Sequence, residues 1–201
     1  MSSIAISGDT SGTVSLAAPA VAGTNTITLP AGTGTMAVQG ASTNIVSGTL
    51  QSATSGIAIT FTGIPSWIKR ITMQVVGITP SGSASNFVIR IGSGSIVSTG
   101  YAATSSGGVT TLNSNASTVG FPISPQTYAS TALISGQMIL TLVNSATNLW
   151  VASGFFHNTS STAFSLSNGN LALSGALDRI QIATANGTDT FTAGSVNILY
   201  E

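Results

Sequence analysis

From residue 57 onward, apolar and polar residues alternate with a period of two over short stretches of the chain. Ile57, Ile59 and Phe61 are separated by small or polar residues, and this spacing is typical of a strand with one buried face. Turn residues recur at intervals of about eight to twelve residues, an arrangement found in sandwiches and barrels. We therefore predict an all-β fold, an antiparallel β-sandwich with a jelly-roll-like arrangement. Further strands are predicted at residues 67–76, 86–91, 96–104, 137–144, 149–156, 163–166 and 171–173.

The C-terminal residues 177–201 predict two strands joined by a tight turn. Ile180 and Ile182 alternate with polar residues, and the apolar positions within 196–200 do the same. Asn186-Gly187 between them favours the positive φ angles of a hairpin turn. We expect a closing hairpin whose second strand holds the C-terminus in a sheet.

The central part of the chain has two less regular segments. Residues 137–144 are apolar on both sides, because Met138 and Leu140 point one way and Ile139 the other. We expect this strand to be covered on both faces, since a strand with one solvated face would alternate. Residues 105–135 contain a glycine-rich turn and two prolines, so we expect irregular or edge structure there.

Residues 1–44 differ from the rest and are predicted to form an extended N-terminal arm ahead of a β-domain at 45–201. Up to about residue 40 the arm contains one charged residue, Asp9, and no aromatic residue. Each of its short alternating pieces holds two apolar side chains, worth about 1.5–3 kcal/mol apiece when buried. Ordering the backbone costs about 1–2 kcal/mol per residue, so the arm is not expected to fold unaided. It is either a floppy tail or an arm that anchors the protein by pairing with other subunits, and we favour the anchor.

Charged residues make up only 4% of the chain, against about 25% in an ordinary soluble domain. Four basic and four acidic residues give a formal net charge of zero, and a neutral protein associates readily. We expect the charged residues of Asp178-Arg179 and Lys69-Arg70 to be paired, or exposed at sheet edges. Because no basic field is available for phosphates, nucleic-acid binding is not expected. The composition favours a protein built for an assembly.

Few residues are available for catalysis. The chain has no cysteine, its one histidine is His157, and its acids are Asp9, Asp178, Asp189 and Glu201. No G-x-S-x-G motif supports a serine hydrolase, and no pair of acids has a spacing that favours a glycosidase. A hydrolase with His157 as its base is the weakest of our hypotheses. We predict no enzymatic activity, no catalytic or cofactor-binding residue, no metal site and no cofactor.

Two other groups of residues could bind ligands, and a structural role is favoured for each. Asn186 to Asp189 could offer oxygens to calcium but lacks the regular acidic spacing of a calcium loop, so we favour a turn. Trp67, Trp150, Tyr101 and Tyr128 could stack on sugar rings. Because both tryptophans lie at the ends of predicted core strands, packing in the core or between subunits is the preferred interpretation.

The start of the chain shows no targeting segment. Residues 1–4 (MSSI) lack a basic region followed by a long apolar run, so we expect no signal peptide. No stretch approaches about 20 consecutive apolar residues, so membrane insertion is not expected either.

Two segments of the chain resemble proteins of known type. Residues 11–38 (SGTVSLAAPAVAGTNTITLPAGTGTMAV) and 177–201 (LDRIQIATANGTDTFTAGSVNILYE) are similar to the N- and C-terminal segments of virion appendage proteins of tailed bacteriophages. The resemblance lies in the T-S-G-x-V-x-L and A-G-x-N-T-x-T-L-P runs, and in an x-D-R-I strand followed by a D-T-F turn. It implies homotrimers, β-sandwich or jelly-roll heads and no enzymatic activity.

Together these observations favour a structural protein on the virion surface, made in the host cytoplasm. Its arm (1–44) would dock on the major capsid protein or on tail or portal components, as in a capsid decoration (cement) protein or head fibre. The alternative is a short tail fibre or receptor-binding protein whose β-domain (45–201) recognises host surface carbohydrate.

Overall fold

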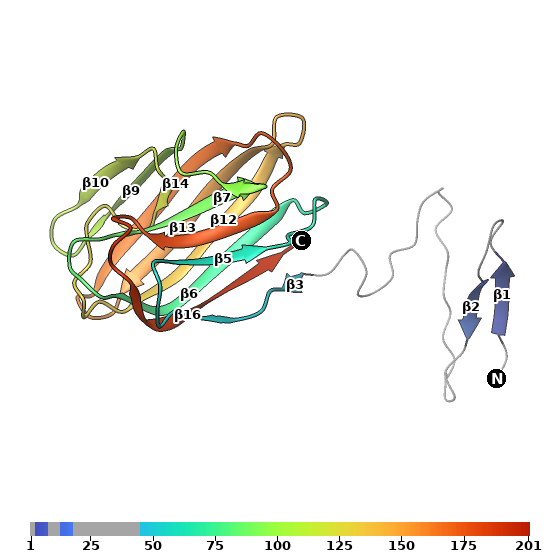
Figure 1. Cartoon of the computed structure of the whole chain (residues 1–201), viewed down its shortest axis with the longest axis horizontal. Coiled ribbons are helices and arrows are strands. Elements are labelled where there is room, and N and C mark those ends of the chain that lie inside the picture. Colours follow the sequence, from blue (N-terminus) through green and yellow to red (C-terminus); the bar gives the residue numbers. More distant parts are fainter. Residues whose placement is uncertain (1–2, 8–12, 18–44) are drawn as a thin grey trace. The chain divides into compact units, whose positions relative to one another are not determined.

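The computed structural model describes residues 3–7, 13–17 and 45–201 (Figure 1). The chain divides into two compact units, Met1–Ala37 and Val38–Glu201. In the first unit, β1 (Ser3–Ser7) and β2 (Thr13–Ala17) pair antiparallel, with Ser3 opposite Ala17. The other alternating pieces of the predicted arm, at residues 27–29 and 36–38, lie outside the described residues.

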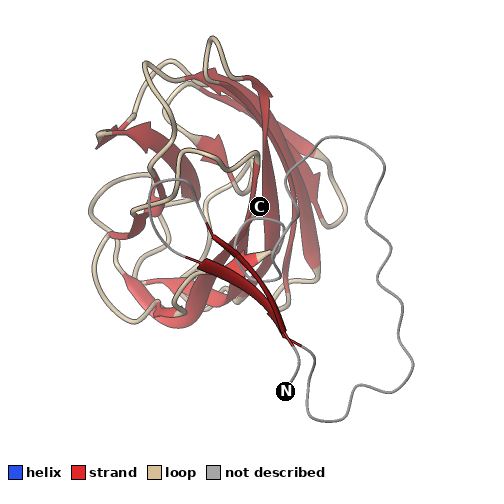
Figure 2. Cartoon of the chain, turned by 90° about the vertical axis from the view of Figure 1, so that its right-hand side faces the viewer, coloured by secondary structure: helices blue, strands red, loops and turns tan. Residues whose placement is uncertain are grey.

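The second unit is a β-sandwich of two antiparallel sheets, which confirms the predicted fold class (Figure 1). In the larger sheet the strand order is β10-β9-β14-β13-β12-β6-β16-β3, and β4 also pairs with β16. In the smaller sheet the order is β11-β7-β15-β5, and β8 pairs with β7. Figure 2 shows strands and loops throughout residues 45–201, with no helix in that range. The larger sheet contains β3 (Val46–Ser47), β4 (Gln51–Ser52), β6 (Arg70–Pro80), β9 (Ala102–Gly108), β10 (Asn113–Ser117), β12 (Ile134–Asn144), β13 (Leu149–Asn158), β14 (Ala163–Ala172) and β16 (Phe191–Tyr200); the smaller contains β5 (Ala58–Thr62), β7 (Phe87–Ser93), β8 (Ser95–Ile96), β11 (Phe121–Pro122) and β15 (Arg179–Thr184).

The core between the sheets is made by the apolar positions of the alternating strands. Ile71 and Met73 of β6 and Ile89 of β7 are fully buried and belong to one continuous cluster. Phe87 of β7 stacks on Phe191 of β16 with ring centroids 5.1 Å apart, so an aromatic pair joins the two sheets. The period of two in the sequence therefore identified the buried face of most strands.

The predicted C-terminal hairpin is wrong, because its two strands belong to different sheets. β15 pairs with β7 and β5, whereas β16 pairs with β6, β3 and β4. The turn at Asn186-Gly187 is present, with Gly187 at a φ of 68°, but it carries the chain from one sheet to the other. Alternation shows which face of a strand is buried and not which strand lies beside it. The expectation that a strand holds the C-terminus is confirmed, since β16 runs to Tyr200 between β6 and β3.

The expected double covering of residues 137–144 is also wrong. Met138 and Leu140 are buried, but Val143 on the other face of β12 is 59% exposed. Each sheet packs on the other with one face only. No described element of residues 45–201 lies over the outer face of this part of β12. The apolar residues on its outer side are therefore surface residues.

The predicted strand boundaries also differ from the observed ones, most clearly at three places. β6 begins at Arg70, after a turn in which the Ile68 amide bonds to the Pro65 carbonyl. The strand predicted at 96–104 is divided into β8 and β9. The two strands predicted between 163 and 173 are a single β14, in which Gly169 packs closely on β9.

The segment 105–135 contributes more to the core than its sequence indicates. It contains the end of β9, β10, the short strand β11 and the start of β12. Phe121, Ile123 and Ala132 from this segment are fully buried. Edge and irregular structure is indeed present, but it closes one side of the sandwich.

Candidate functional site

The candidate site is the outer face of the larger sheet, the face directed away from the smaller sheet. On β13 and β14 the buried residues alternate with outward ones, as expected for strands with one packed face. Val151, Phe155, Phe164 and Leu166 point outward and are 42%, 51%, 42% and 47% exposed. Phe155 lies opposite Leu166, and its ring centroid is 6.4 Å from that of Phe164. We call these four residues the apolar patch.

The strands around the apolar patch carry no Asp, Glu, Lys or Arg. Between Arg90 and Asp178 the sequence contains no Asp, Glu, Lys or Arg, and this stretch includes β9, β10, β12, β13 and β14. The outward neighbours of the patch are Ser, Thr and Asn, together with Gln137 opposite Phe155 and His157 opposite Phe164. Phe155, Phe164 and Leu166 are contiguous, whereas Val151 lies further along β13, beyond the outward Ser153. Contiguous exposed apolar side chains mark contact surfaces. A partner of this face must therefore be bound by apolar contact and neutral hydrogen bonds.

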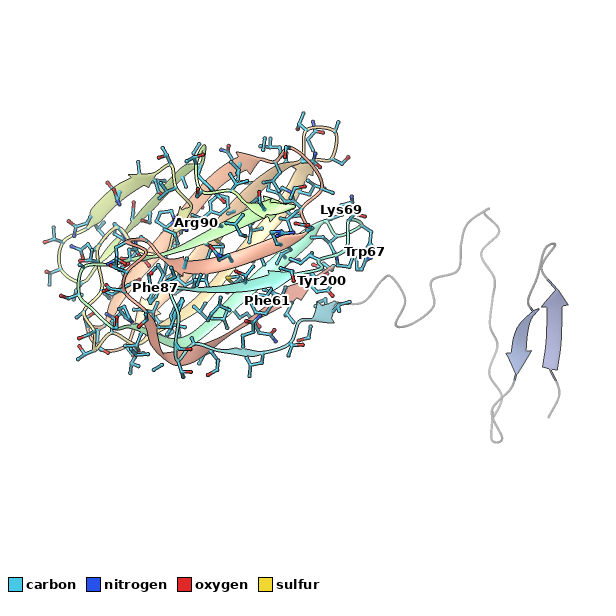
Figure 3. All side chains as sticks on the ribbon, viewed as in Figure 1. Phe61, Trp67, Lys69, Phe87, Arg90 and Tyr200 are labelled. Atoms are coloured by element: carbon cyan, nitrogen blue, oxygen red, sulfur yellow. The ribbon has the colours of Figure 1, made fainter. Side chains whose placement is uncertain are left out.

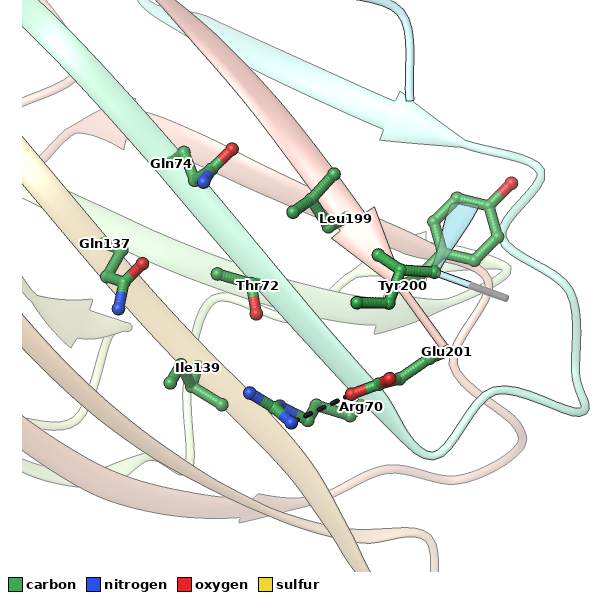
Figure 4. A pocket seen from close by; sticks show the side chains of 9 residues that line it. Arg70, Thr72, Gln74, Gln137, Ile139, Leu199, Tyr200 and Glu201 are labelled. Atoms are coloured by element: carbon green, nitrogen blue, oxygen red, sulfur yellow. Dashed lines mark hydrogen bonds and ion pairs between the residues drawn. The ribbon is translucent and has the colours of Figure 1, made fainter. Parts of the chain in front are cut away.

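Next to the apolar patch, the same face contains a hollow of about 200 Å³ over β6, β12 and β16 (Figure 4). Gln74 of β6 lies opposite Gln137 of β12. Two residues along the strands, on the same face, Thr72 lies opposite both Ile139 of β12 and Leu199 of β16. The paired strands thus line the hollow with two amides, a hydroxyl and two aliphatic side chains, and Ile45 and Tyr200 line it as well.

An ion pair closes one end of the hollow. The Arg70 guanidinium lies 2.9 Å from a carboxylate oxygen of Glu201, and the side chains are 49% and 40% exposed. The backbones are paired as well, because the Glu201 amide donates to the Arg70 carbonyl. Figure 4 marks this pair as the interaction among the side chains that it draws. The hollow therefore has charged groups at its end but no net charge.

A second ion pair joins Asp178 and Arg179 at the smaller sheet, which is one of the two outcomes expected for these residues. Arg179 donates to both carboxylate oxygens of Asp178, at 2.8 and 3.0 Å. These hydrogen bonds hold the pKa of Asp178 below its usual value. The Gly94 amide donates to the same carboxylate, so the pair also fixes the turn between β7 and β8. Asp178 and Arg179 thus have a structural role here.

Three of the four aromatic residues considered for sugar stacking are buried. Trp150 is in the core, which confirms the preferred interpretation for this residue. Burial raises the pKa of Tyr101 and of Tyr128 to about 12, because it disfavours the charged phenolate. Trp67 remains 43% exposed, with its ring centroid 6.3 Å from that of Tyr200 near the C-terminal end of the domain (Figure 3). Of the four, only Trp67 presents a substantial ring surface to solvent.

The acids and the histidine are not brought together into a metal-binding group. No cluster of three or more His, Cys, Asp or Glu residues is found in the described ranges of the chain. His157 is exposed on β13, opposite Ser135 and Phe164. The side-chain oxygen of Asn186 accepts hydrogen bonds from the backbone amides of Thr188 and Asp189, so the turn predicted for this segment is confirmed. Asp9 lies outside the described residues.

The sequence did not reveal the apolar patch or the hollow. Residues 149–156 (LWVASGFF) predict a core strand, and Phe155 and Phe156 are adjacent there, so one of them had to face outward. That geometric consequence was the available signal for the patch. The hollow had no such signal, because Thr72, Gln137 and Leu199 are distant in the sequence and meet only through strand pairing.

Comparison with known proteins gives no relative. No family model, no curated protein and no solved structure matches this chain. Among the residues that the structure describes, no helix is both long and apolar enough to cross a membrane.

Proposed function

We propose that this chain is a non-enzymatic structural protein of a tailed-phage virion, a capsid decoration or head-fibre-like protein. It assembles as a homotrimer through the outer face of its larger sheet, and residues 1–44 dock it on another virion protein. The observation that supports this proposal most is the apolar patch, which lies on strands without Asp, Glu, Lys or Arg. The resemblance of residues 11–38 and 177–201 to virion appendage proteins supplies the biological setting.

Burial of the apolar patch provides the driving force for the trimer. Removing a phenylalanine side chain from water contributes about 1.5–3 kcal/mol, and each copy offers Phe155 and Phe164 together with two aliphatic side chains. Three copies whose outer faces converge on a threefold axis bring no Asp, Glu, Lys or Arg side chains together, because this part of the face contains none. Neutral serine, threonine and asparagine side chains around the patch suit the polar rim of such an interface.

The first prediction tests the trimer. We expect the full chain to elute with the mass of three chains in size-exclusion chromatography with light scattering. Replacing Phe155→Ser and Phe164→Ser together should yield monomers, because losing about 3 kcal/mol of contact per copy weakens association at least a hundredfold. The trimer should persist in molar NaCl, since salt screens charge interactions and leaves apolar contacts in place.

The control for this prediction is Val143→Ser, an exposed residue of the same sheet face outside the apolar patch. This variant should remain trimeric, and circular dichroism should show the same β-structure in all three proteins. A monomeric wild-type chain, or a Phe155/Phe164 variant that is still trimeric, would contradict assembly through the patch.

The second prediction concerns docking. A variant lacking residues 1–40 should keep a folded, trimeric β-domain and should no longer be incorporated into virus particles. The reason is that the apolar patch lies within 45–201, whereas the docking segment has been removed. Particles assembled with the full-length chain serve as the reference, and the bound fraction is measured by quantitative gel analysis. Incorporation of the truncated chain at full occupancy would show that residues 1–40 are not the anchor.

A further inference from the structure

We propose that the hollow over β6, β12 and β16 is a binding site for a neutral saccharide unit. Its volume of about 200 Å³ suits a single sugar ring on an open sheet face (Figure 4). The inference rests on residues outside the apolar patch, but Gln137 lies directly opposite Phe155 of β13, so the hollow borders the proposed trimer interface. Three features of the lining carry it: unused hydrogen-bonding groups, a neutralised pair of charges and an aliphatic surface.

The first feature is a group of polar side chains without protein partners. Among the described residues that line the hollow, Gln74, Gln137 and Thr72 form no hydrogen bond with one another or with the ion pair (Figure 4). Each amide offers both donors and an acceptor, and the hydroxyl offers both as well. Adjacent hydroxyl groups of a sugar need this combination, because each of them donates and accepts. The cross-strand register places Gln74 beside Gln137, so two neighbouring hydroxyls can be bound at once.

The second feature is the charge balance. Arg70 alone would favour an anion such as a phosphate or a carboxylate. Because it is paired with Glu201 at 2.9 Å, an anionic or cationic ligand would have to break the pair or face its like-charged member. A neutral ligand can instead accept from the guanidinium and donate to the carboxylate. The ion pair therefore selects against charged ligands and still supplies strong hydrogen bonds.

The third feature is the aliphatic surface beside these polar groups. Ile139 and Leu199 flank Thr72 on the two neighbouring strands. A sugar ring has C–H groups between its hydroxyls, and these can pack on the two side chains while the hydroxyls reach the amides. The strands hold all of these groups in fixed register, so little conformational freedom is lost on binding. The lining as a whole is complementary to a neutral saccharide.

The test uses the full-length protein on an array of neutral and anionic glycans, followed by NMR titration with the free sugar that binds best. We expect a neutral glycan to bind and to shift the backbone amide resonances of Thr72, Gln74 and Gln137 in a saturable way. The double variant Gln74→Ala/Gln137→Ala should lose at least tenfold in affinity. The control is Asn168→Ala, an exposed amide on the same sheet face but outside the hollow, which should bind like the wild type.

Other outcomes would overturn the inference. They are the absence of any bound glycan, binding of anionic glycans only, and equal binding by the double variant. Chemical-shift changes confined to residues around Trp67 would likewise place the binding site at the exposed tryptophan and contradict binding in the hollow. Light scattering on the double variant shows whether the trimer is intact, so a failed trimer and a failed saccharide site are distinguished.

Discussion

Replacing Gly194 by alanine is expected to lower the free energy of unfolding of the β-domain by about 3 kcal/mol or more. Gly194 has a φ of 101° and lies where the pairing of β16 with β6 shifts register. A Cβ there would stand 2.6 Å from the carbonyl carbon and oxygen of Gly77 and from the nitrogen of Ile78. These are backbone atoms inside a paired sheet, so no side-chain rotation can relieve the overlap. Urea denaturation at a fixed protein concentration measures the loss.

The matched control for this prediction is Gly77→Ala in β6, the strand that pairs with β16 at this point. Gly77 also has a positive φ, of 61°, but a Cβ on it would have no atom within 4 Å. The Gly77→Ala substitution should therefore lower the free energy of unfolding only by the backbone strain, about 1–2 kcal/mol. The difference between the two variants isolates the steric term. If Gly194→Ala were no more destabilising than Gly77→Ala, close backbone approach at this bulge would not be what requires glycine.

The burial pattern of the strands could be predicted because it depends on local geometry alone. Successive side chains in a strand point to opposite sides, so Phe87, Ile89 and Ile91 had to share a face, and all three are buried. Strand pairing is not local in this sense. β15 and β16 have equally regular alternation, and nothing in either pattern says that the intervening turn crosses between sheets.

The candidate site could be predicted even less well, for the same reason. Phe155 and Phe164 look like core residues in the sequence, because large aromatic residues in strands are usually buried. Only the pairing of β13 with β14, and the lack of a described element over their outer face, makes them a patch. The hollow requires three strands from distant parts of the chain. The scarcity of charge is a property of composition, so the prediction of an assembly rests on the sequence alone and stays a prediction.

Replacing Phe87 by alanine is expected to cost about 3–5 kcal/mol, the loss typical of a fully buried phenylalanine. Phe87 has no exposed surface and stacks on Phe191 across the sandwich, with ring planes inclined by only 7°. Its ring centroid also lies 5.9 Å from that of Tyr128, which comes from the segment that closes one side of the sandwich. The ring therefore connects both sheets and the closing segment, and the cavity left by alanine would weaken all three contacts. Because a domain is stable by only about 5–15 kcal/mol, this variant should be close to unfolding at 37 °C.

The graded variant Phe87→Leu separates lost volume from lost aromatic stacking. Leucine fills most of the space, so it should cost about 1.5 kcal/mol or less if packing volume dominates. A larger loss, approaching that of alanine, would assign the stabilisation to stacking on Phe191, since pairs of this kind contribute about 0.5–1.5 kcal/mol beyond their burial. Calorimetry on the wild type and both variants at equal concentration gives the comparison. A loss below about 1 kcal/mol for Phe87→Ala would mean that this ring does not couple the two sheets.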